Sequence, residues 1–342
     1  MEKENIRTIK ERFIGISCAY LDSSDSISVE YAGLADKEEN IAVDENTVFP
    51  ACSISKFITA LCIMRICEQG LINIDEPANN YLIRWKLRTL DGIESEATVR
   101  SLLTHTAGII DSEDGFYGLR RNDPQIGLID VLDGKTSYNN RPAREEKTPG
   151  TEFEYSDAGY CVLQMLIEDI TQKSFEVFAK ENVFQPLDLK RTFFASLKNL
   201  EEYEKEFKLA TGYDENGMPI LGKYPQVPDL AASGLWSTPK ELLMIAREFI
   251  KAFNGKSSML IESSAREMAR PSQNFSWVGL GVFMSGENEI TSRGWGENGQ
   301  SMLKLNYVTG ETAVVMTNQN PGVDQTESGI EALVNRKINK EL

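Results

Sequence analysis

The sequence has a single histidine, His105, and no two of its five cysteines show the C-x-x-C spacing of a zinc or redox motif. It also lacks the G-x-S-x-G sequence that carries the nucleophile of many α/β-hydrolases. A Ser-His-Asp triad would have to use His105. These absences predict a protein without a metal ion or other cofactor. If it is a serine enzyme, its base is expected to be a lysine or a tyrosine.

Basic residues are outnumbered, and long apolar runs are missing. The 36 Lys and Arg against 52 Asp and Glu give a net charge of −16, which argues against nucleic acid or an anionic membrane surface as a partner. No apolar stretch is long enough to span a bilayer. Residues 1–5 are polar and resemble no signal peptide, so we expect a cytoplasmic protein. The oligomeric state has no signature in the sequence.

Strand-like and helix-like patterns are unevenly distributed along the chain. Residues 13–21 and 27–34 predict a β-hairpin, and residues 278–285, 300–307 and 312–317 predict further strands. Most of the chain between them is helical or irregular. We therefore predict an α/β protein of the α+β type: an antiparallel sheet from N- and C-terminal strands, flanked by helices, with a mostly helical insertion. The predicted single domain, 1–342, has an α/β part (1–70 and 235–342) and a helical part (71–234).

A nearly continuous apolar run at residues 57–67 predicts a helix that is buried on all sides. Gly70 is expected to end this helix. Ser53 stands at its start, where free N–H groups favour a negative oxygen, and Lys56 lies one turn further on. A buried lysine must find a partner or lose its proton. Ser53 is thus either a helix cap or a nucleophile beside an amine.

Three motifs together bear on the choice between a helix cap and a nucleophile for Ser53. Residues 53–56 read S-I-S-K, residues 155–157 read Y-S-D, and residues 102–108 read L-L-T-H-T-A-G. In order and spacing they resemble the S-x-x-K, Y-x-N and L-L-x-H-T-S-G segments of the serine β-lactamase and penicillin-binding-protein superfamily, in its class C β-lactamase-like branch. D-aminopeptidases and esterases are relatives within it. The resemblance implies a β-lactamase/transpeptidase-like fold, and a packing role for His105.

The resemblance also implies catalytic roles. Ser53 would attack a carbonyl carbon, and Lys56 and Tyr155 would form the acid/base pair, with either as the base of acylation. Burial is expected to depress the pKa of Lys56. Backbone N–H groups of Ser53 and of a late strand, near Glu297, would bind the oxyanion.

Two departures from the family pattern bear on substrate binding. Asp157 stands where relatives have Asn: if ionised it would hold Lys56 charged, and if protonated it would resemble Asn. The third motif, K-T-G or H-x-G in relatives, falls on residues 294–296, G-W-G, and lacks its cation. A shift of one or two residues would place Arg293 or Ser292 there. We expect Asp157, Trp295, Gly296 and Glu297 to orient or bind the substrate, with weak recognition of carboxylates such as penicillins.

The resemblance therefore predicts a serine hydrolase that forms a covalent acyl-enzyme on a small-molecule or peptide substrate containing an amide, peptide or ester bond. Peptidase or esterase action is favoured over β-lactamase turnover. Two alternatives stay open. Asp157 and the missing cation fit a catalytically impaired relative that acts as a binding or sensory module, and transfer of the acyl group to an amine is a weaker possibility.

Overall fold

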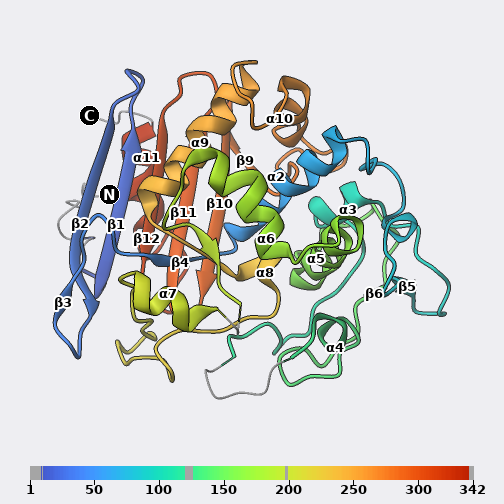
Figure 1. Ribbon diagram of the computed structural model, residues 1–342, viewed down its shortest axis with the longest axis horizontal. Coiled ribbons are helices and arrows are strands. Elements are labelled where there is room, and N and C mark those ends of the chain that lie inside the picture. The colour runs from blue at the N-terminus through green and yellow to red at the C-terminus, as the bar shows by residue number, and fades with distance from the viewer. Residues whose placement is uncertain (1–8, 10, 120–125, 197–198, 339–342) are drawn as a thin grey trace.

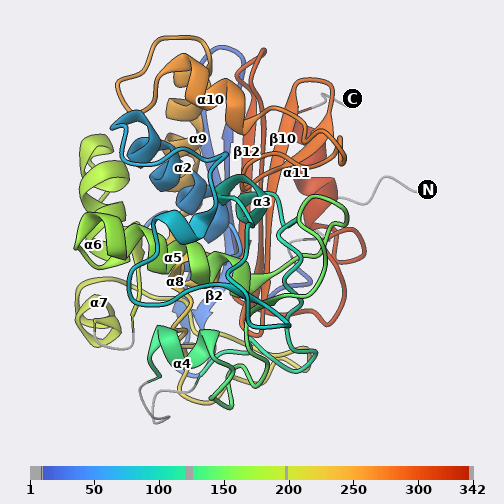
Figure 2. The same ribbon diagram turned by 90° about the vertical axis from the view of Figure 1, so that its right-hand side faces the viewer.

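The computed structural model describes residues 9, 11–119, 126–196 and 199–338 (Figures 1 and 2). Its main feature is a seven-stranded antiparallel sheet in the order β3-β2-β1-β12-β11-β10-β9. Strands from both ends of the chain therefore lie side by side, as predicted. The strands are β1 (Gly15–Leu21), β2 (Ile27–Asp36), β3 (Ile41–Ala42), β9 (Phe283–Gly286), β10 (Glu289–Gly296), β11 (Gly299–Asn306) and β12 (Thr312–Thr317).

The predicted hairpin of β1 and β2 is confirmed. Its turn is fixed by the carboxylate of Asp22, which accepts hydrogen bonds from the backbone N–H groups of Ser24 and Ser26. The predicted strand at residues 278–285 is wrong over its first half. There the chain turns at Gly281, which has φ +69° and donates to Leu103 O. Strand β10 was expected only from the resemblance, which places the third motif on a late strand, and not from the pattern of its residues.

The helix predicted at residues 57–67 is confirmed, whereas those at residues 230–233 and 262–268 were not predicted. The helices are α2 (Ser55–Glu68), α3 (Val99–Leu103), α4 (Leu128–Leu132), α5 (Asp157–Thr171), α6 (Phe175–Ala179), α7 (Leu200–Glu206), α8 (Leu230–Ser233), α9 (Pro239–Phe253), α10 (Glu262–Met268) and α11 (Ile330–Ile338). Thr98, Ser156 and Thr238 cap α3, α5 and α9 through their side-chain oxygens. The amphipathic pattern of residues 328–342 predicts a terminal helix; α11 forms it from Ile330 to Ile338, and residues 339–342 lie outside the described ones.

The sheet separates two apolar layers (Figure 2). Helix α11 covers one face, where it packs with Ile16, Met302 and Val315. The other face, with Leu303 and Val314, packs into the main core that contains α2, α5 and α9. Eleven of the fourteen residues of α2 are buried, so the predicted central helix is buried over most of its surface, with Arg65, Cys67 and Glu68 partly exposed. Its C-terminal turn is closed by Gly70 in the left-handed conformation.

Two small sheets accompany the main one. Strands β4 (Phe49–Cys52), β8 (Leu235–Ser237) and β7 (Phe193–Phe194) form the first, which packs against the main sheet through β4, and β5 (Arg88–Thr89) with β6 (Arg144–Glu145) forms the second. All five cysteines are free, and four are buried. No helix among the described residues is long and apolar enough to cross a membrane. The proposed division of the domain into two parts stays a prediction.

Candidate active site

Ser53 lies in a tight turn between β4 and α2. Cys52, the residue before it, has φ +49°, a left-handed conformation that costs a non-glycine residue about 1–3 kcal/mol. Ser55 holds the turn: its Oγ donates to Cys52 O at 2.6 Å and accepts from Leu235 N at 3.0 Å. The strained backbone therefore has a fixed shape, and it directs Ser53 toward the lysine of the first helical turn.

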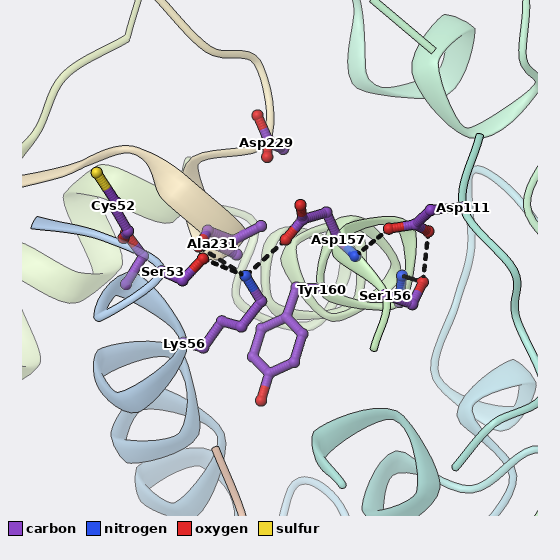
Figure 3. Close-up of polar contacts among 12 residues, drawn as sticks. Cys52, Ser53, Lys56, Asp111, Ser156, Asp157, Tyr160, Asp229 and Ala231 are labelled. Atoms are coloured by element: carbon purple, nitrogen blue, oxygen red, sulfur yellow. Dashed lines mark hydrogen bonds and ion pairs between the residues drawn. The ribbon is translucent and has the colours of Figure 1, made fainter. Parts of the chain in front are cut away.

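The side chain of Lys56 is buried, with its nitrogen at the centre of a polar cluster (Figure 3). Nζ donates to Asp157 Oδ1 at 2.6 Å, to Ala232 O at 3.0 Å and to Ser53 Oγ at 3.1 Å. An ammonium group has three N–H donors, which these three acceptors occupy, and Tyr155 makes a further polar contact with the nitrogen. The structure thus brings Ser53, Lys56 and Asp157 together from two helices.

The charge of Lys56 is held in place by its partner. Burial alone would lower the pKa of Lys56, but the Asp157 carboxylate and, less strongly, Tyr155 raise it above its ordinary value. The expectation that burial would depress this pKa is therefore wrong. Sequence reasoning recognised the burial and named Asp157 as a possible partner. At 2.6 Å, the effect of Asp157 on the pKa of Lys56 adds to that of Tyr155, and together they outweigh burial.

Tyr155 lies on the other side of the lysine. Its ring stacks on His105 with centroids 4.3 Å apart, and Lys56 Nζ is 4.8 Å from its centroid. Burial raises the pKa of Tyr155, while Lys56 and a polar contact with Ser53 oppose that rise. His105 Nδ1 accepts the backbone N–H of Ser156 at 3.1 Å, and burial beside Lys56 keeps the histidine pKa well below its usual range. His105 is thus a neutral packing residue that orients Tyr155.

Two further carboxyl groups flank Asp157, and sequence reasoning missed both. Asp111 accepts the Ser156 hydroxyl at 2.7 Å and the backbone N–H groups of Asp157 and Ala158 at 2.6 and 3.2 Å (Figure 3). Asp229 accepts the Tyr138 hydroxyl at 2.5 Å. Burial and the charge of Asp157 raise the pKa of Asp111 to about 7 and that of Asp229 to about 8. Both residues reach α5 only through tertiary packing, so no local sequence motif indicates their position.

A pocket of about 420 Å³ opens beside Ser53. Trp295, Gly296 and Glu297 line it, as does Asp157, so the structure brings the predicted binding residues to one space with the serine. Trp295 is half exposed, and its Nε1 donates to Asn320 Oδ1 at 2.8 Å. A larger depression of about 780 Å³ around Arg100 contains none of the predicted site residues. Among the described residues, no cluster of His, Cys, Asp and Glu is suited to a metal ion.

Strand β10 presents a free edge next to this pocket. β9 pairs with β10 only as far as Thr291. Tyr307 N donates to Asn288 O, so these two residues form a hydrogen-bonded pair of the antiparallel ladder. Such pairs recur at every second residue, so the backbone N–H and C=O groups of Gly294 face β11 and those of Trp295 point away from it. A Cβ on Gly294 would lie 2.4 Å from Ala51 O, so glycine is needed for β10 to approach the turn before Ser53.

An antiparallel sheet flanked by helices, with a serine and a lysine at the head of a buried helix, defines a β-lactamase/transpeptidase-like protein. The chain belongs to the β-lactamase family, whose model matches residues 3–335. The predicted fold and family are confirmed.

Three similar proteins illustrate the range of the family. Protein flp from Staphylococcus aureus (strain N315) is 23% identical over 302 residues, which are 84% of this chain and 56% of flp. Esterase EstB from Burkholderia gladioli is 31% identical over 173 residues, 48% of this chain and 43% of EstB. The structure of D-amino acid amidase from Ochrobactrum anthropi SV3 aligns with TM-score 0.74 and 20% identity over 95% of this chain and 96% of the amidase. The chain thus spans little more than half the length of flp. These likenesses support hydrolase activity in general.

Proposed function

We propose that the protein is a serine hydrolase that forms a covalent acyl-enzyme on Ser53 with an amide, peptide or ester substrate. The observation that carries this proposal is the position of Ser53 Oγ, 3.1 Å from Lys56 Nζ and at the wall of a pocket of about 420 Å³. A helix cap would need neither the buried ammonium nor the pocket. The family and the names of its amidase and esterase relatives support the same reaction class.

Tyr155 is the better candidate for the base of acylation. The three hydrogen bonds of Lys56 leave its nitrogen no lone pair to accept the serine proton. In the proposed reaction, the phenolate form of Tyr155 takes the proton of Ser53 as Oγ bonds to the carbonyl carbon. The pKa of Tyr155 is raised by burial, so this phenolate is a minority form, which the Lys56 charge stabilises. Tyr155 then protonates the leaving nitrogen or oxygen. In deacylation it takes a proton from water, the water oxygen bonds to the carbonyl carbon, and Ser53 recovers its proton.

The oxyanion is expected to bind between two backbone N–H groups. One belongs to Ser53, which precedes the first turn of α2, where N–H groups have no partner within the helix. The other is that of Trp295, because the strand register directs it to the free edge of β10. The sequence-based expectation placed this donor near Glu297. Glu297 lies in the two-residue turn after β10, so we propose Trp295 as the donor instead.

The charges of the pocket favour a neutral acyl group over one with a carboxylate. Asp157 and Glu297 are its charged lining residues within the described part of the chain, and both are acidic. A carboxylate bound there would face like charges. This supports the prediction of weak penicillin recognition, and favours esters or amides without an acidic group.

Turnover of p-nitrophenyl esters and D-amino-acid amides tests the proposed function. We expect Ser53→Ala, Tyr155→Phe and Lys56→Met each to lower kcat by on the order of 10³-fold or more. Lys304→Met is a matched control, because Lys304 is equally buried and ion-paired, with Glu289 at 2.7 Å, outside the site. Its kcat should stay within about twofold. Equal rates in wild type and Lys56→Met would instead support the alternative of a binding or sensory module, for which the charged Lys56–Asp157 pair is the favouring observation.

A further inference from the structure

Ser53 also borders a second, much smaller space. This cavity of about 10 Å³ lies between α2, the helix-end motif and β10, and the polar residues that line it are Ser53, Lys56, His105, Tyr155, Ser292 and Arg293. A space of this size has room for one water molecule, which needs two to four polar partners to be stable. The cavity is too small for a substrate group, so it has a different role from the large pocket on the other side of Ser53.

Ser292 is the unexplained member of this wall. It is 3% exposed, and its position opposite Leu303 on β11 places its side chain on the sheet face that packs toward α2. Within the described part of the chain its hydroxyl has no hydrogen-bond partner, whereas neighbouring Thr291 donates to Leu303 O at 2.9 Å. A hydroxyl without a protein partner that borders a cavity large enough for one water favours a water molecule there.

The next residue along the strand is turned to the opposite face. The guanidinium of Arg293 pairs with Glu331 on α11 at 2.8 Å. Both positions that a shifted third motif would offer line the cavity, but the charged end of Arg293 is held by Glu331. The Ser292 hydroxyl is therefore the β10 group that we consider for the Ser53–Lys56–Tyr155 cluster.

We propose that the cavity binds a single water molecule held by the Ser292 hydroxyl, and that this water donates a hydrogen bond to the oxygen of Tyr155. Ser292 is then a positioning residue for proton transfer. Lys56 acts on Tyr155 through its charge and a polar contact, and the water would add a further hydrogen bond to the phenolate. The water only donates a hydrogen bond. None of its own bonds forms or breaks while the proton moves from Ser53 to Tyr155.

This inference rests on the proposed function, in which Tyr155 takes the proton of Ser53. A substitution that fills the cavity should therefore act on proton transfer and leave substrate binding intact. We expect Ser292→Val to lower kcat for a p-nitrophenyl ester by about tenfold, the loss of one hydrogen bond, with KM within twofold. The acidic limb of the pH–rate profile should move to higher pH, because the phenolate loses a donor. Ser292→Ala leaves space for water and should be affected less.

Ser17 supplies the control. It is also a buried strand serine without a hydrogen-bond partner for its hydroxyl among the described residues, on the same sheet but in β1. Ser17→Val should change neither kcat nor the pH profile. A Ser292→Val protein that folds and keeps the wild-type kcat and pH profile would overturn the proposal.

A direct measurement separates this inference from the proposed function. A crystal structure of the wild-type protein at a resolution that shows ordered water should have one water within about 3 Å of both Ser292 Oγ and the Tyr155 oxygen. A dry cavity would overturn the inference even if turnover depends on Ser53. Absence of Ser53-dependent turnover with the water in place would instead overturn the proposed function, and with it the catalytic role of Ser292.

Discussion

Asp157 is the single residue with most influence on the charge of the site. Its carboxylate lies 2.6 Å from Lys56 Nζ and is the strongest of the neighbours that raise the pKa of the lysine. An amide at this position would still accept a hydrogen bond, but would not stabilise the ammonium by its charge. The pair therefore sets the pH above which the Ser53–Lys56–Tyr155 cluster can give up a proton.

Asp157→Asn is predicted to move the acidic limb of the pH–kcat profile to lower pH. Removal of an opposite charge in direct contact shifts a pKa by about one to three units, and here it lowers the pKa of the cluster. The measurement is kcat for a neutral ester between pH 5 and 10. Asp114→Asn, an exposed change in the neighbouring irregular segment, should leave the profile unchanged. An acidic limb that stays in place, or moves to higher pH, would contradict this reading of the ion pair.

At the residue scale, the sequence indicated which side chains meet but not what their meeting does. Ser53 and Lys56 are one helical turn apart, so their proximity is a local property. Asp111 and Asp229 come from segments far from α5 in the sequence and reach it only in the folded chain. For that reason neither they nor the net direction of the Lys56 pKa could be predicted.

At the scale of elements, the N-terminus of α5 positions both Tyr155 and Asp157. The first N–H groups of a helix need acceptors, and here Ser156 supplies one by accepting from Gly159 N, and Asp111 supplies two more. Asp111 also accepts the hydroxyl of the cap itself. This segment is thus fixed by a carboxyl group from a different part of the chain.

Asp111→Ala should therefore weaken both stability and catalysis. Three hydrogen bonds are lost at a buried helix start, and we expect the free energy of unfolding to fall by about 1–3 kcal/mol. Because Asp157 loses the acceptor of its backbone N–H, kcat should fall more than tenfold while KM changes little. Denaturant unfolding and ester turnover measure the two effects, and Asp111→Asn should lie between Ala and wild type. Loss of stability without any loss of kcat would show that Asp111 does not position the site.

Elements defined by local patterns were predictable, and those defined by their neighbours were not. The β1–β2 hairpin and the capped starts of α3, α5 and α9 carry their signals within a few residues. Strand β10 contains Gly294, Gly296 and Arg293, which interrupt an apolar alternation. Its strand conformation comes from pairing with β11 along its whole length, and Gly294 serves the close approach to Ala51.

At the scale of the whole molecule, strands from both ends of the chain complete the sheet that supports the site. Period-two patterns at the two ends were sufficient to predict this antiparallel sheet and the helices around it. The pocket beside Ser53 was less predictable, because its walls come from β4, the turn after β10 and loops near residues 116–118 and 225–227. The main apolar core is continuous from the sheet through α2 to α5.

The buried Asp229 and the half-buried Asp111 should make the free energy of unfolding fall as pH rises. Asp229 has a pKa of about 8 and Asp111 of about 7 in the folded protein, against an ordinary value of 3.8. Between pH 4 and 8 the folded state holds protons that the unfolded state has released, so raising the pH favours unfolding, by as much as about 1.4 kcal/mol per pH unit for each group.

Asp229→Asn should flatten the dependence of the unfolding free energy on pH between 5 and 8. Asp36→Asn is the contrasting variant, since the pKa of Asp36 is lowered, mainly by Lys223 against the effect of burial, and it titrates below this range. It should change stability by a similar amount at each pH from 5 to 8. Denaturant unfolding at several pH values is the measurement. A stability that rises from pH 5 to 8, or an unchanged slope in Asp229→Asn, would show that Asp229 is ionised in the folded protein.

The central claim is that Ser53 is the nucleophile, and active-site labelling tests it most directly. Wild-type protein and Ser17→Val are treated with a fluorophosphonate, and the modified residue is located by mass spectrometry of the intact protein and its peptides. Our account predicts one label per chain in both, on Ser53, and none in Ser53→Ala. A wild-type protein that remains unlabelled, or a Ser53→Ala variant that is labelled as fast as wild type, would contradict it.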